Sequence, residues 1–157
     1  MFPVALQAPE EVHVVRRRWF RRPEFHVTTF NPQDLAAATG LDAQELARIG
    51  AQLNAELTAA RPLRFDDRVS AVSDDDGRRT LVAFCDVDGL EQTYERLSAL
   101  AGRELPRPPT HVTLYTAQPG MEGIGLSTQR DVEAKTVALP ATEAKKVLAA
   151  IGADAAA

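Results

Sequence analysis

Two histidines, each followed two positions later by a threonine, are the residues of this chain best suited to chemistry. His26-Val27-Thr28 and His111-Val112-Thr113 repeat one tripeptide, whereas His13, the third histidine, has no hydroxyl residue two positions on. Both copies lie in short apolar, β-branched stretches bounded by proline, a pattern that predicts strands. Because side chains alternate along a strand, the His and Thr of each copy point to one face, about 6 to 7 Å apart, and a phosphate group has the size to contact both.

The spaced pair resembles the 2H phosphoesterase superfamily, which carries one His-x-Thr/Ser motif in each of two lobes. The superfamily includes the bacterial 2′-5′ RNA ligases and the cyclic nucleotide phosphodiesterases of tRNA splicing. The two histidines lie 85 positions apart (111 minus 26), and the resemblance covers residues from about 24 to 140. The chain departs from the family at Thr29, where an apolar residue is usual, and in the short segment before His26, which has room for a strand but hardly for a strand and a helix.

The resemblance implies an α+β fold and a site made from both tripeptides. The expected architecture is two pseudo-symmetric lobes of mostly antiparallel sheet, with helices on the outer faces and the active-site cleft between the lobes. His26 and His111 would be the catalytic acid and base, since the ordinary pKa of histidine lies near 6.5. Thr28 and Thr113 would bind the phosphate and stabilise developing charge. No metal and no cofactor is expected.

The substrate implied by the resemblance is a phosphodiester beside a ribose oxygen, above all a 2′,3′-cyclic phosphate at an RNA end, or a related 2′-5′ or cyclic nucleotide diester. Such an activity would serve RNA processing or repair. The sequence leaves open whether water or a ribose hydroxyl attacks, giving hydrolysis or ligation, and which histidine is the base. The alternative to an enzyme is a non-catalytic module of the same fold that binds an RNA end or nucleotide.

Other chemistries have weaker support in the sequence. A metal site at His26 and His111 would need a third ligand, and the sequence offers no His or Cys close to either histidine. A serine nucleophile at a Gly-x-Ser-x-Gly turn is absent. Two strand histidines with purely structural roles are the remaining alternative.

Composition limits the class of protein. The chain has 157 residues, enough for one domain over 1–157, and a net charge of −4, which argues against a general nucleic-acid coat protein. Cys85 is the only cysteine, so no intrachain disulfide is available, and we expect it to be a buried apolar residue in a reducing compartment. The sequence has no membrane-spanning run or signal peptide pattern, so we expect a cytoplasmic monomer that does not contact membranes.

One basic cluster precedes the first tripeptide. It offers either a rim that attracts phosphate, with an aromatic ring available to stack on a base, or a solvated edge strand protected by charge. The candidate rim residues are Arg16, Arg17, Arg18, Trp19, Phe20, Arg21 and Arg22, together with Tyr115 after the second tripeptide.

The predicted elements place a strand at each tripeptide, with helices and a hairpin between them. Helix starts are predicted at Asn31 before Pro32, and at Asp42 and Asp88, each followed three positions later by glutamate. In the first half of the chain we predict an irregular lead-in over 1–10, a strand over 11–15, the first motif strand over 24–30 and helices over 32–39 and 42–60. In the second half we predict a hairpin over 63–72 and 78–87, a helix over 88–102, the second motif strand from 110, a last strand over 133–139 and a C-terminal helix from 140.

Two loops and the C-terminal tail complete the predictions. Residues 74–76 are three aspartates that we interpret as a hairpin turn, since the calcium-loop spacing is absent. The glycine-rich stretch 118–126 does not fit a P-loop and predicts either a flap leading into a short strand beside the site or an ordinary turn. Residues 153–157 are expected to be frayed.

Overall fold

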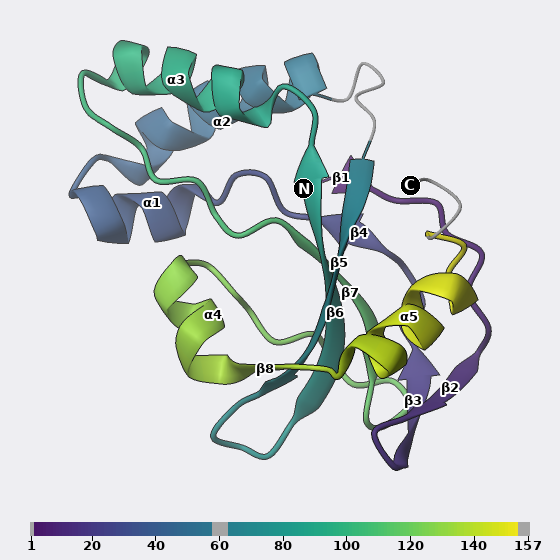
Figure 1. Cartoon of the computed structure of the whole chain (residues 1–157). Coiled ribbons are helices and arrows are strands. Elements are labelled where there is room, and N and C mark those ends of the chain that lie inside the picture. Colours follow the sequence, from purple (N-terminus) through teal and green to yellow (C-terminus); the bar gives the residue numbers. More distant parts are fainter. Residues whose placement is uncertain (1, 58–62, 154–157) are drawn as a thin grey trace.

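The computed structural model of the chain describes residues 2–57 and 63–153, which form helices and an antiparallel sheet (Figure 1). The strands are β1 (Phe2–Pro3), β2 (Glu11–Val14), β3 (Arg17–Arg21), β4 (His26–Val27), β5 (Leu63–Ser73), β6 (Arg79–Val87), β7 (His111–Thr116) and β8 (Thr136–Ala138). The helices are α1 (Pro32–Thr39), α2 (Ala43–Leu57), α3 (Leu90–Ala101), α4 (Gln129–Lys135) and α5 (Ala141–Ala150). The predicted α+β class is confirmed. The predicted helix end at 58–60 and the tail at 154–157 lie outside the described residues.

Strand β7 joins the two parts of the sheet. The strand order is β1-β4-β7-β6-β5-β8, and every pairing is antiparallel. Two strands share one edge of β7, because β4 pairs with it at Val112 and β3 pairs with it at Tyr115 and Thr116. Strand β6 pairs with the other edge. The two motif strands are therefore neighbours in one sheet.

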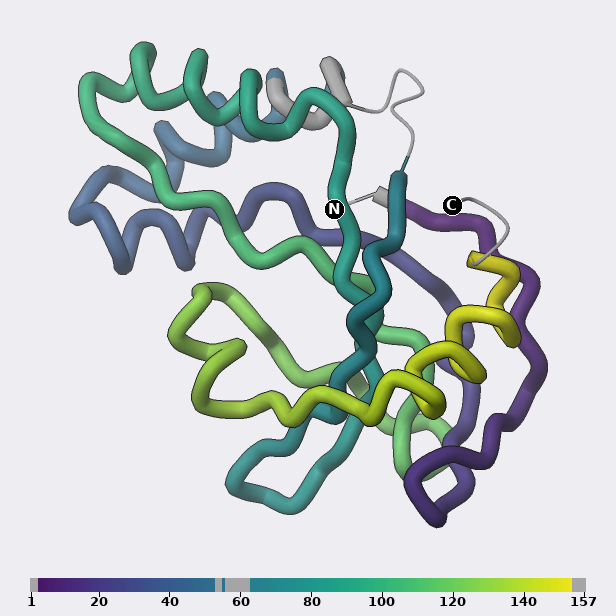
Figure 2. The backbone as a smooth tube through the Cα atoms, viewed as in Figure 1, coloured from purple at the N-terminus to yellow at the C-terminus, as the bar shows by residue number. Residues whose placement is uncertain are grey.

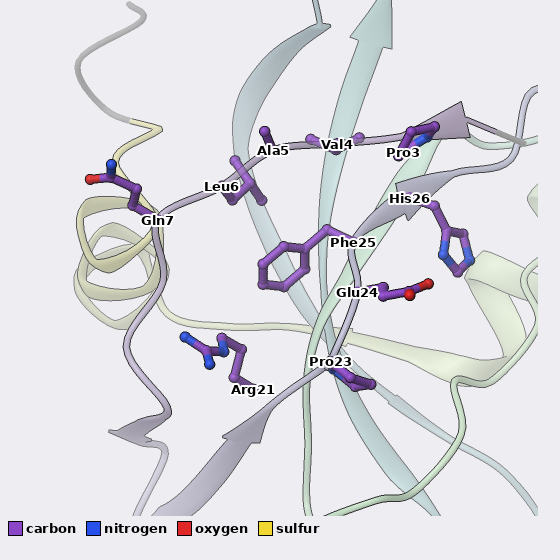
Figure 3. Close-up of a pocket in the computed structure, with 10 residues that line it drawn as sticks. All are labelled: Pro3, Val4, Ala5, Leu6, Gln7, Arg21, Pro23, Glu24, Phe25 and His26. Atoms are coloured by element: carbon purple, nitrogen blue, oxygen red, sulfur yellow. The ribbon is translucent and has the colours of Figure 1, made fainter.

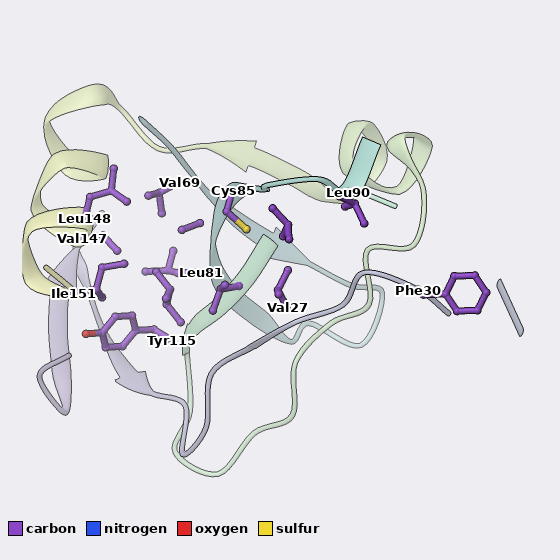
Figure 4. Close-up of a cluster of buried hydrophobic side chains, with 14 of the residues drawn as sticks. Val27, Phe30, Val69, Leu81, Cys85, Leu90, Tyr115, Val147, Leu148 and Ile151 are labelled. Atoms are coloured by element: carbon purple, nitrogen blue, oxygen red, sulfur yellow. The ribbon is translucent and has the colours of Figure 1, made fainter. Parts of the chain in front are cut away.

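The sheet separates two apolar clusters. The main core lies between one face and the helices α1, α2, α3 and α5, and Figure 4 shows part of it. A smaller cluster on the other face joins β5 and β6 to Ile124 and Leu126, which come from the loop between β7 and α4. Strand β6 supplies both clusters by alternation: Leu81, Ala83, Cys85 and Val87 face the main core, and Val82 and Phe84 face the smaller one.

Distant parts of the chain meet at the β2 end of the sheet. Helix α5 contacts β2 and β5, and the purple N-terminal part of the tube runs beside the yellow C-terminal helix (Figure 2). The backbone N–H of Val15 donates to the Glu143 carboxylate at 3.2 Å. No helix within residues 2–57 and 63–153 is long and apolar enough to cross a bilayer.

Several local signals are confirmed. Asn31 caps α1 by accepting from the backbone N–H groups of Gln33 and Asp34, and Gly40 ends the helix with a φ of 74°. Asp42 accepts from the backbone of Glu45 at the start of α2. In the β5–β6 turn the Asp74 carboxylate accepts from the backbone N–H groups of Asp76 and Arg78, as expected for a turn residue.

The N-terminal region differs from the prediction. Residues 2–3 are not an irregular lead-in, because β1 pairs with β4. The predicted strand over 24–30 is too long, since β4 covers only His26 and Val27. The chain leaves the sheet after Val27, and the Thr29 carbonyl accepts from the Tyr94 hydroxyl of α3 at 2.6 Å.

Three later predictions are wrong in detail. The strand predicted over 133–139 is shorter, because residues 133–135 belong to α4, which starts at a Thr128–Asp131 capping box, and the strand β8 covers only Thr136–Ala138. Helix α3 begins after Gly89, which has a φ of 81°, and Asp88 makes an ion pair with Arg64 instead of capping the helix. The glycine-rich loop leads into no strand between residues 117 and 128, all of which are described.

Candidate active site

The two tripeptides lie side by side in the sheet. Val27 of β4 is paired with Val112 of β7 in antiparallel register. Both valines are 0% exposed in the main core, so the flanking His and Thr side chains, which are half-buried, occupy the opposite face. The pairing therefore places two histidines and two threonines on one face of the sheet.

The register crosses the two motifs. In an antiparallel pair the residues one step on either side of a matched pair also face each other. Continuing the register from the Val27–Val112 pair sets His26 across from Thr113, and sets Thr28, which directly follows β4, across from His111. Each histidine thus has the threonine of the other motif as its cross-strand neighbour, an arrangement that is symmetric about the valine pair.

All four polar side chains line one cavity of about 380 Å³, here called the motif cavity. Its other walls come from the first turn of α1, from Pro108 and from residues 122–127. This volume lies within the range of small-molecule sites, roughly 300–1,000 Å³. The structure thus brings together the four residues that the sequence singles out.

His111 has a defined orientation. Its Nδ1 lies 2.8 Å from the carbonyl oxygen of Pro109, and because a carbonyl can only accept, Nδ1 carries the proton. The Phe84 ring, opposite in the β6–β7 ladder, lies 6.4 Å from the imidazole, centroid to centroid. Burial lowers the pKa of His111, and the nearby His26 acts in the same direction, although the hydrogen bond to Pro109 opposes both. Neutral His111 therefore presents an unprotonated Nε2.

The glycine-rich loop forms one wall of the motif cavity. Gly123 packs against the Thr113 side chain, which lies 3.6 Å from the position that a Cβ would take. Ile124 and Leu126 anchor the loop in the smaller apolar cluster, and the Arg22 guanidinium donates to the Met121 carbonyl. The loop therefore lies beside the site, as one of the two expectations has it, but it is an anchored wall and not a flap or hairpin.

The charges around the motif cavity are mostly negative. Arg22 is the one Lys or Arg side chain among its described lining residues, whereas Glu24, Asp34 and Glu122 are acidic. No group of three or more His, Cys, Asp or Glu side chains in the part of the chain that the structure describes is placed to hold a metal ion. The first-turn amides of α1 are already capped by Asn31.

The basic cluster does not form one rim. Within residues 16–22, all of which are described, only Arg22 lines the motif cavity. Trp19 is 1% exposed, and its indole N–H donates to the Val14 carbonyl at 3.2 Å, so a stacking role for Trp19 is wrong. Nor is β3 an edge strand, because it pairs with both β2 and β7.

The other arginines of the cluster lie away from the motif cavity. Arg16 is in the β2–β3 turn, Arg17 lies over the Trp19 ring at 5.3 Å, and Arg18 lies over the Phe20 ring at 5.9 Å. The Arg21 guanidinium donates to the Ala8 carbonyl at 2.7 Å. Arg17, Arg18 and Arg21 therefore contact the N-terminal part of the fold.

Three further residues from the sequence analysis lie outside the motif cavity. Tyr115 is 0% exposed and its hydroxyl donates to the Pro9 carbonyl at 3.1 Å, so its predicted place at a substrate rim is wrong. Cys85 is 4% exposed, and burial raises the pKa of its thiol to about 12, which confirms it as a buried apolar residue. His13 is exposed on β2.

Sequence reasoning missed several lining residues. Glu24 lies two positions before His26, so strand alternation could have placed it on the same face. Asp34 and Glu122 reach the cavity from α1 and from the glycine-rich loop, and no local pattern marks them. The Pro109 carbonyl, which orients His111, belongs to the backbone and leaves no trace in residue types.

Comparisons with protein-family models, with curated proteins and with solved structures find no match to this chain.

Proposed function

We propose that this protein is a phosphodiesterase of the 2H phosphoesterase type, which acts without a metal ion on 2′,3′-cyclic phosphate RNA ends or on related 2′-5′ and cyclic nucleotide phosphodiesters. The observation that carries the proposal is that the Val27–Val112 pair sets both tripeptides side by side, with His26, Thr28, His111 and Thr113 lining one cavity. Displacement at phosphorus needs a proton acceptor and a proton donor on the two sides of the phosphate. A module that only binds has no use for such a pair.

The environment of His111 supports its role as the general base. Its lowered pKa keeps it neutral at pH 7, and the Pro109 carbonyl leaves Nε2 free to accept a proton. Nε2 takes a proton from water as the water oxygen attacks phosphorus. The bond from phosphorus to the departing ribose oxygen breaks, and protonated His26 gives its proton to that oxygen. Exchange of one proton with solvent restores both histidines.

The threonines complete the site. Because Thr113 faces His26 and Thr28 faces His111, a phosphate between the two histidines lies within reach of both hydroxyls. Each hydroxyl donates a hydrogen bond to a non-bridging oxygen, which holds phosphorus in line and stabilises the charge that develops there. The symmetry about Val27 and Val112 also supports the expected architecture, in which two pseudo-symmetric lobes meet at the site.

The test is hydrolysis, in the presence of a chelator, of a short RNA that ends in a 2′,3′-cyclic phosphate. We expect His26→Ala and His111→Ala each to lower turnover by at least about 100-fold, because a general acid or base contributes roughly 10² to 10⁴. His13→Ala is the matched control, since His13 is an exposed strand histidine outside the motif cavity, and it should keep wild-type turnover.

Two results would contradict the proposal. Wild-type protein that binds the RNA tightly without turnover would indicate the non-catalytic binding module. Turnover that survives His26→Ala and His111→Ala, or that is lost equally in His13→Ala, would show that the two motifs do not carry the chemistry.

A further inference from the structure

A small cavity of about 160 Å³ adjoins the motif cavity between α1 and α4, and we call it the interhelix slot. Its walls come from α1, from the start of α4 and from residues 106–108 of the segment that joins α3 to β7. Figure 1 shows α1 and α4 on the same side of the sheet, one above the other. The slot and the motif cavity share Asn31, Asp34, Pro108 and Ser127, so one ligand can occupy both.

One wall of the interhelix slot is a single face of α1. Asp34, Leu35 and Ala38 line it, and residues three or four positions apart lie on the same side of a helix. Asp34 is at the end shared with the motif cavity, whereas Leu35 and Ala38 line the slot alone. The polar end of α1 therefore faces the motif cavity, and its apolar residues face the inner part of the slot.

The remaining apolar wall is held in place by the fold. Tyr94 of α3 and Pro106 line the interhelix slot beside Leu35. Leu35 and Tyr94 are 5% and 3% exposed, so only their edges face the slot. The Tyr94 hydroxyl donates to the Thr29 carbonyl at 2.6 Å, which fixes the ring and satisfies its polar group. The slot thus offers a preformed apolar surface to a flat ligand.

Two side chains at the interhelix slot are free to donate hydrogen bonds. Arg107 and Gln129 line the slot but not the motif cavity. Among the residues that the structure describes, neither side chain has a hydrogen-bond or ion-pair partner. In base recognition arginine pairs with O6 and N7 of guanine, and glutamine pairs with N6 and N7 of adenine. Both pairings use N7, an atom that purines have and pyrimidines lack.

A larger cavity of about 880 Å³ lies on the other side of the motif cavity, along β1 and residues 21–26 (Figure 3). It shares only Glu24 and His26 with the motif cavity. Its Leu6 and Phe25 side chains pack against the main core, and Figure 3 shows them on the side of the strand away from His26. A ligand at the motif residues therefore meets a continuous apolar wall in the interhelix slot and not in this larger cavity.

We propose that the interhelix slot binds the base of the nucleotide whose phosphate lies in the motif cavity, and that it prefers purines. This inference rests on the proposed function. The slot has less than half the volume of the motif cavity, so it holds a base while the ribose lies at the shared boundary beside Asp34. The base lies against the Leu35 and Tyr94 wall, and Arg107 and Gln129 donate to its acceptors.

The first test compares three substrates for hydrolysis in the presence of a chelator. These are adenosine 2′,3′-cyclic phosphate, cytidine 2′,3′-cyclic phosphate and methyl riboside 2′,3′-cyclic phosphate, which has no base. We expect the kcat/KM of the adenosine substrate to exceed that of the base-free substrate by about 10-fold or more, because one bound base contributes on this order. It should exceed that of the cytidine substrate by about 5-fold or more, as a well-placed pair of hydrogen bonds discriminates between bases.

Ala38→Trp tests the position of the base. The new ring fills the interhelix slot, so we expect kcat/KM for the adenosine substrate to fall by about 10-fold, mainly through KM, and that for the base-free substrate to stay unchanged. Ala37→Trp is the matched control, because Ala37 is the preceding exposed residue of α1 and does not line the slot. It should change neither substrate. Circular dichroism of both variants checks that they fold.

The double variant Arg107→Ala/Gln129→Ala gives an independent measurement, since both positions are exposed and their loss does not disturb the core. We expect it to bring kcat/KM for the adenosine substrate close to that for the cytidine substrate. Arg130→Ala, at an exposed position of α4 outside the slot, is its control and should keep the wild-type preference.

The outcomes separate this inference from the proposed function. Equal kcat/KM for the adenosine and base-free substrates in the wild type, or an equal loss for both in folded Ala38→Trp, overturns the base site and leaves the proposed function intact. A purine preference that survives the double variant overturns the part given to Arg107 and Gln129. No turnover of any of the three substrates by wild-type protein overturns the proposed function and this inference with it.

Discussion

At the scale of single residues, one backbone oxygen decides what His111 can do. The Pro109 carbonyl fixes the proton on Nδ1, so in the neutral ring Nε2 is the nitrogen that can accept a proton. The neighbouring Phe84 ring shields the imidazole on one side. A buried, oriented and neutral histidine is the form that a general base requires.

The pH profile should report this environment. Because burial lowers the pKa of His111, the residue stays neutral to a lower pH than an ordinary histidine. We therefore expect the acidic limb of kcat/KM to fall off below pH 6.5, about the ordinary histidine value. Rates measured from pH 4.5 to 9 on the cyclic phosphate substrate test this, with His13→Ala as the control. An acidic limb centred above that value would assign the base to another group.

The sequence predicts which side chains come together at the motif cavity better than it predicts their surroundings. A repeated His-x-Thr pattern is visible because residue types and spacing are enough to find it. The orientation of His111 and the approach of Asp34 and Glu122 depend on backbone placement and on contacts between distant segments. Residue types do not encode these contacts locally. The inward turn of Trp19 also follows from pairing of β3 with both neighbours.

At the scale of elements, the β2–β3 turn is strained. Val15 and Arg16 both have positive φ, 46° and 61°, in a two-residue hairpin loop. Only glycine and, to a lesser degree, asparagine and aspartate adopt this region readily, and a β-branched residue such as valine is the least suited to it. Charged side chains near the turn do not remove the free-energy cost of the positive φ angles, because that cost arises within the backbone.

Replacing Val15-Arg16 by Asn-Gly should stabilise the protein. Left-handed backbone costs roughly 1–2 kcal/mol for each unsuited residue, and the added flexibility of glycine in the unfolded chain offsets part of the gain. We expect the melting temperature to rise by a few degrees, at about 2 to 4 °C for each kcal/mol in a chain of this size. Thermal denaturation followed by circular dichroism measures it. An unchanged or lower melting temperature would mean that the Val15 and Arg16 side chains contribute more than their backbone strain costs.

Local sequence signals predict an element well where the residues that start or end it lie within it or directly beside it. Asn31-Pro32 with Gly40 sets the bounds of α1, and Asp74 sets the β5–β6 turn. The prediction fails over 133–135, the first part of the predicted last strand, because the Thr128–Asp131 capping box starts a helix that continues to Lys135. It also fails at β1, whose two residues form a strand only because β4 is available to pair with them.

At the scale of the whole molecule, charge limits the kind of ligand. The net charge is −4, and within the described lining of the motif cavity Arg22 stands against three carboxylates. Most arginines of the 16–22 cluster lie over aromatic rings or bind backbone carbonyls instead of facing this cavity. Few phosphates can therefore be neutralised at once, which favours a short ligand over a long polyanion.

Salt should consequently have little effect on substrate binding. A protein with 6 to 10 phosphate contacts loses roughly 10³ to 10⁵ in affinity between 50 and 200 mM salt, whereas one or two contacts predict less than about a 10-fold loss. We therefore expect KM for the cyclic phosphate RNA to change by less than about 10-fold between 50 and 200 mM salt. A steep dependence that Arg17→Ala or Arg18→Ala reduces would instead show that the basic cluster contacts the RNA backbone.

The pairing of Val27 with Val112 also links the proposed activity to the order of folding. These residues are 85 positions apart (112 minus 27), and contacts between such distant segments form late because loop closure costs entropy before they can contribute. The β5–β6 turn at residues 74–77 lies between them, so neither half of the chain carries both histidines. Turnover regained during refolding would therefore mark the docking of β4 on β7, after helical signals from α1 and α2 have already returned.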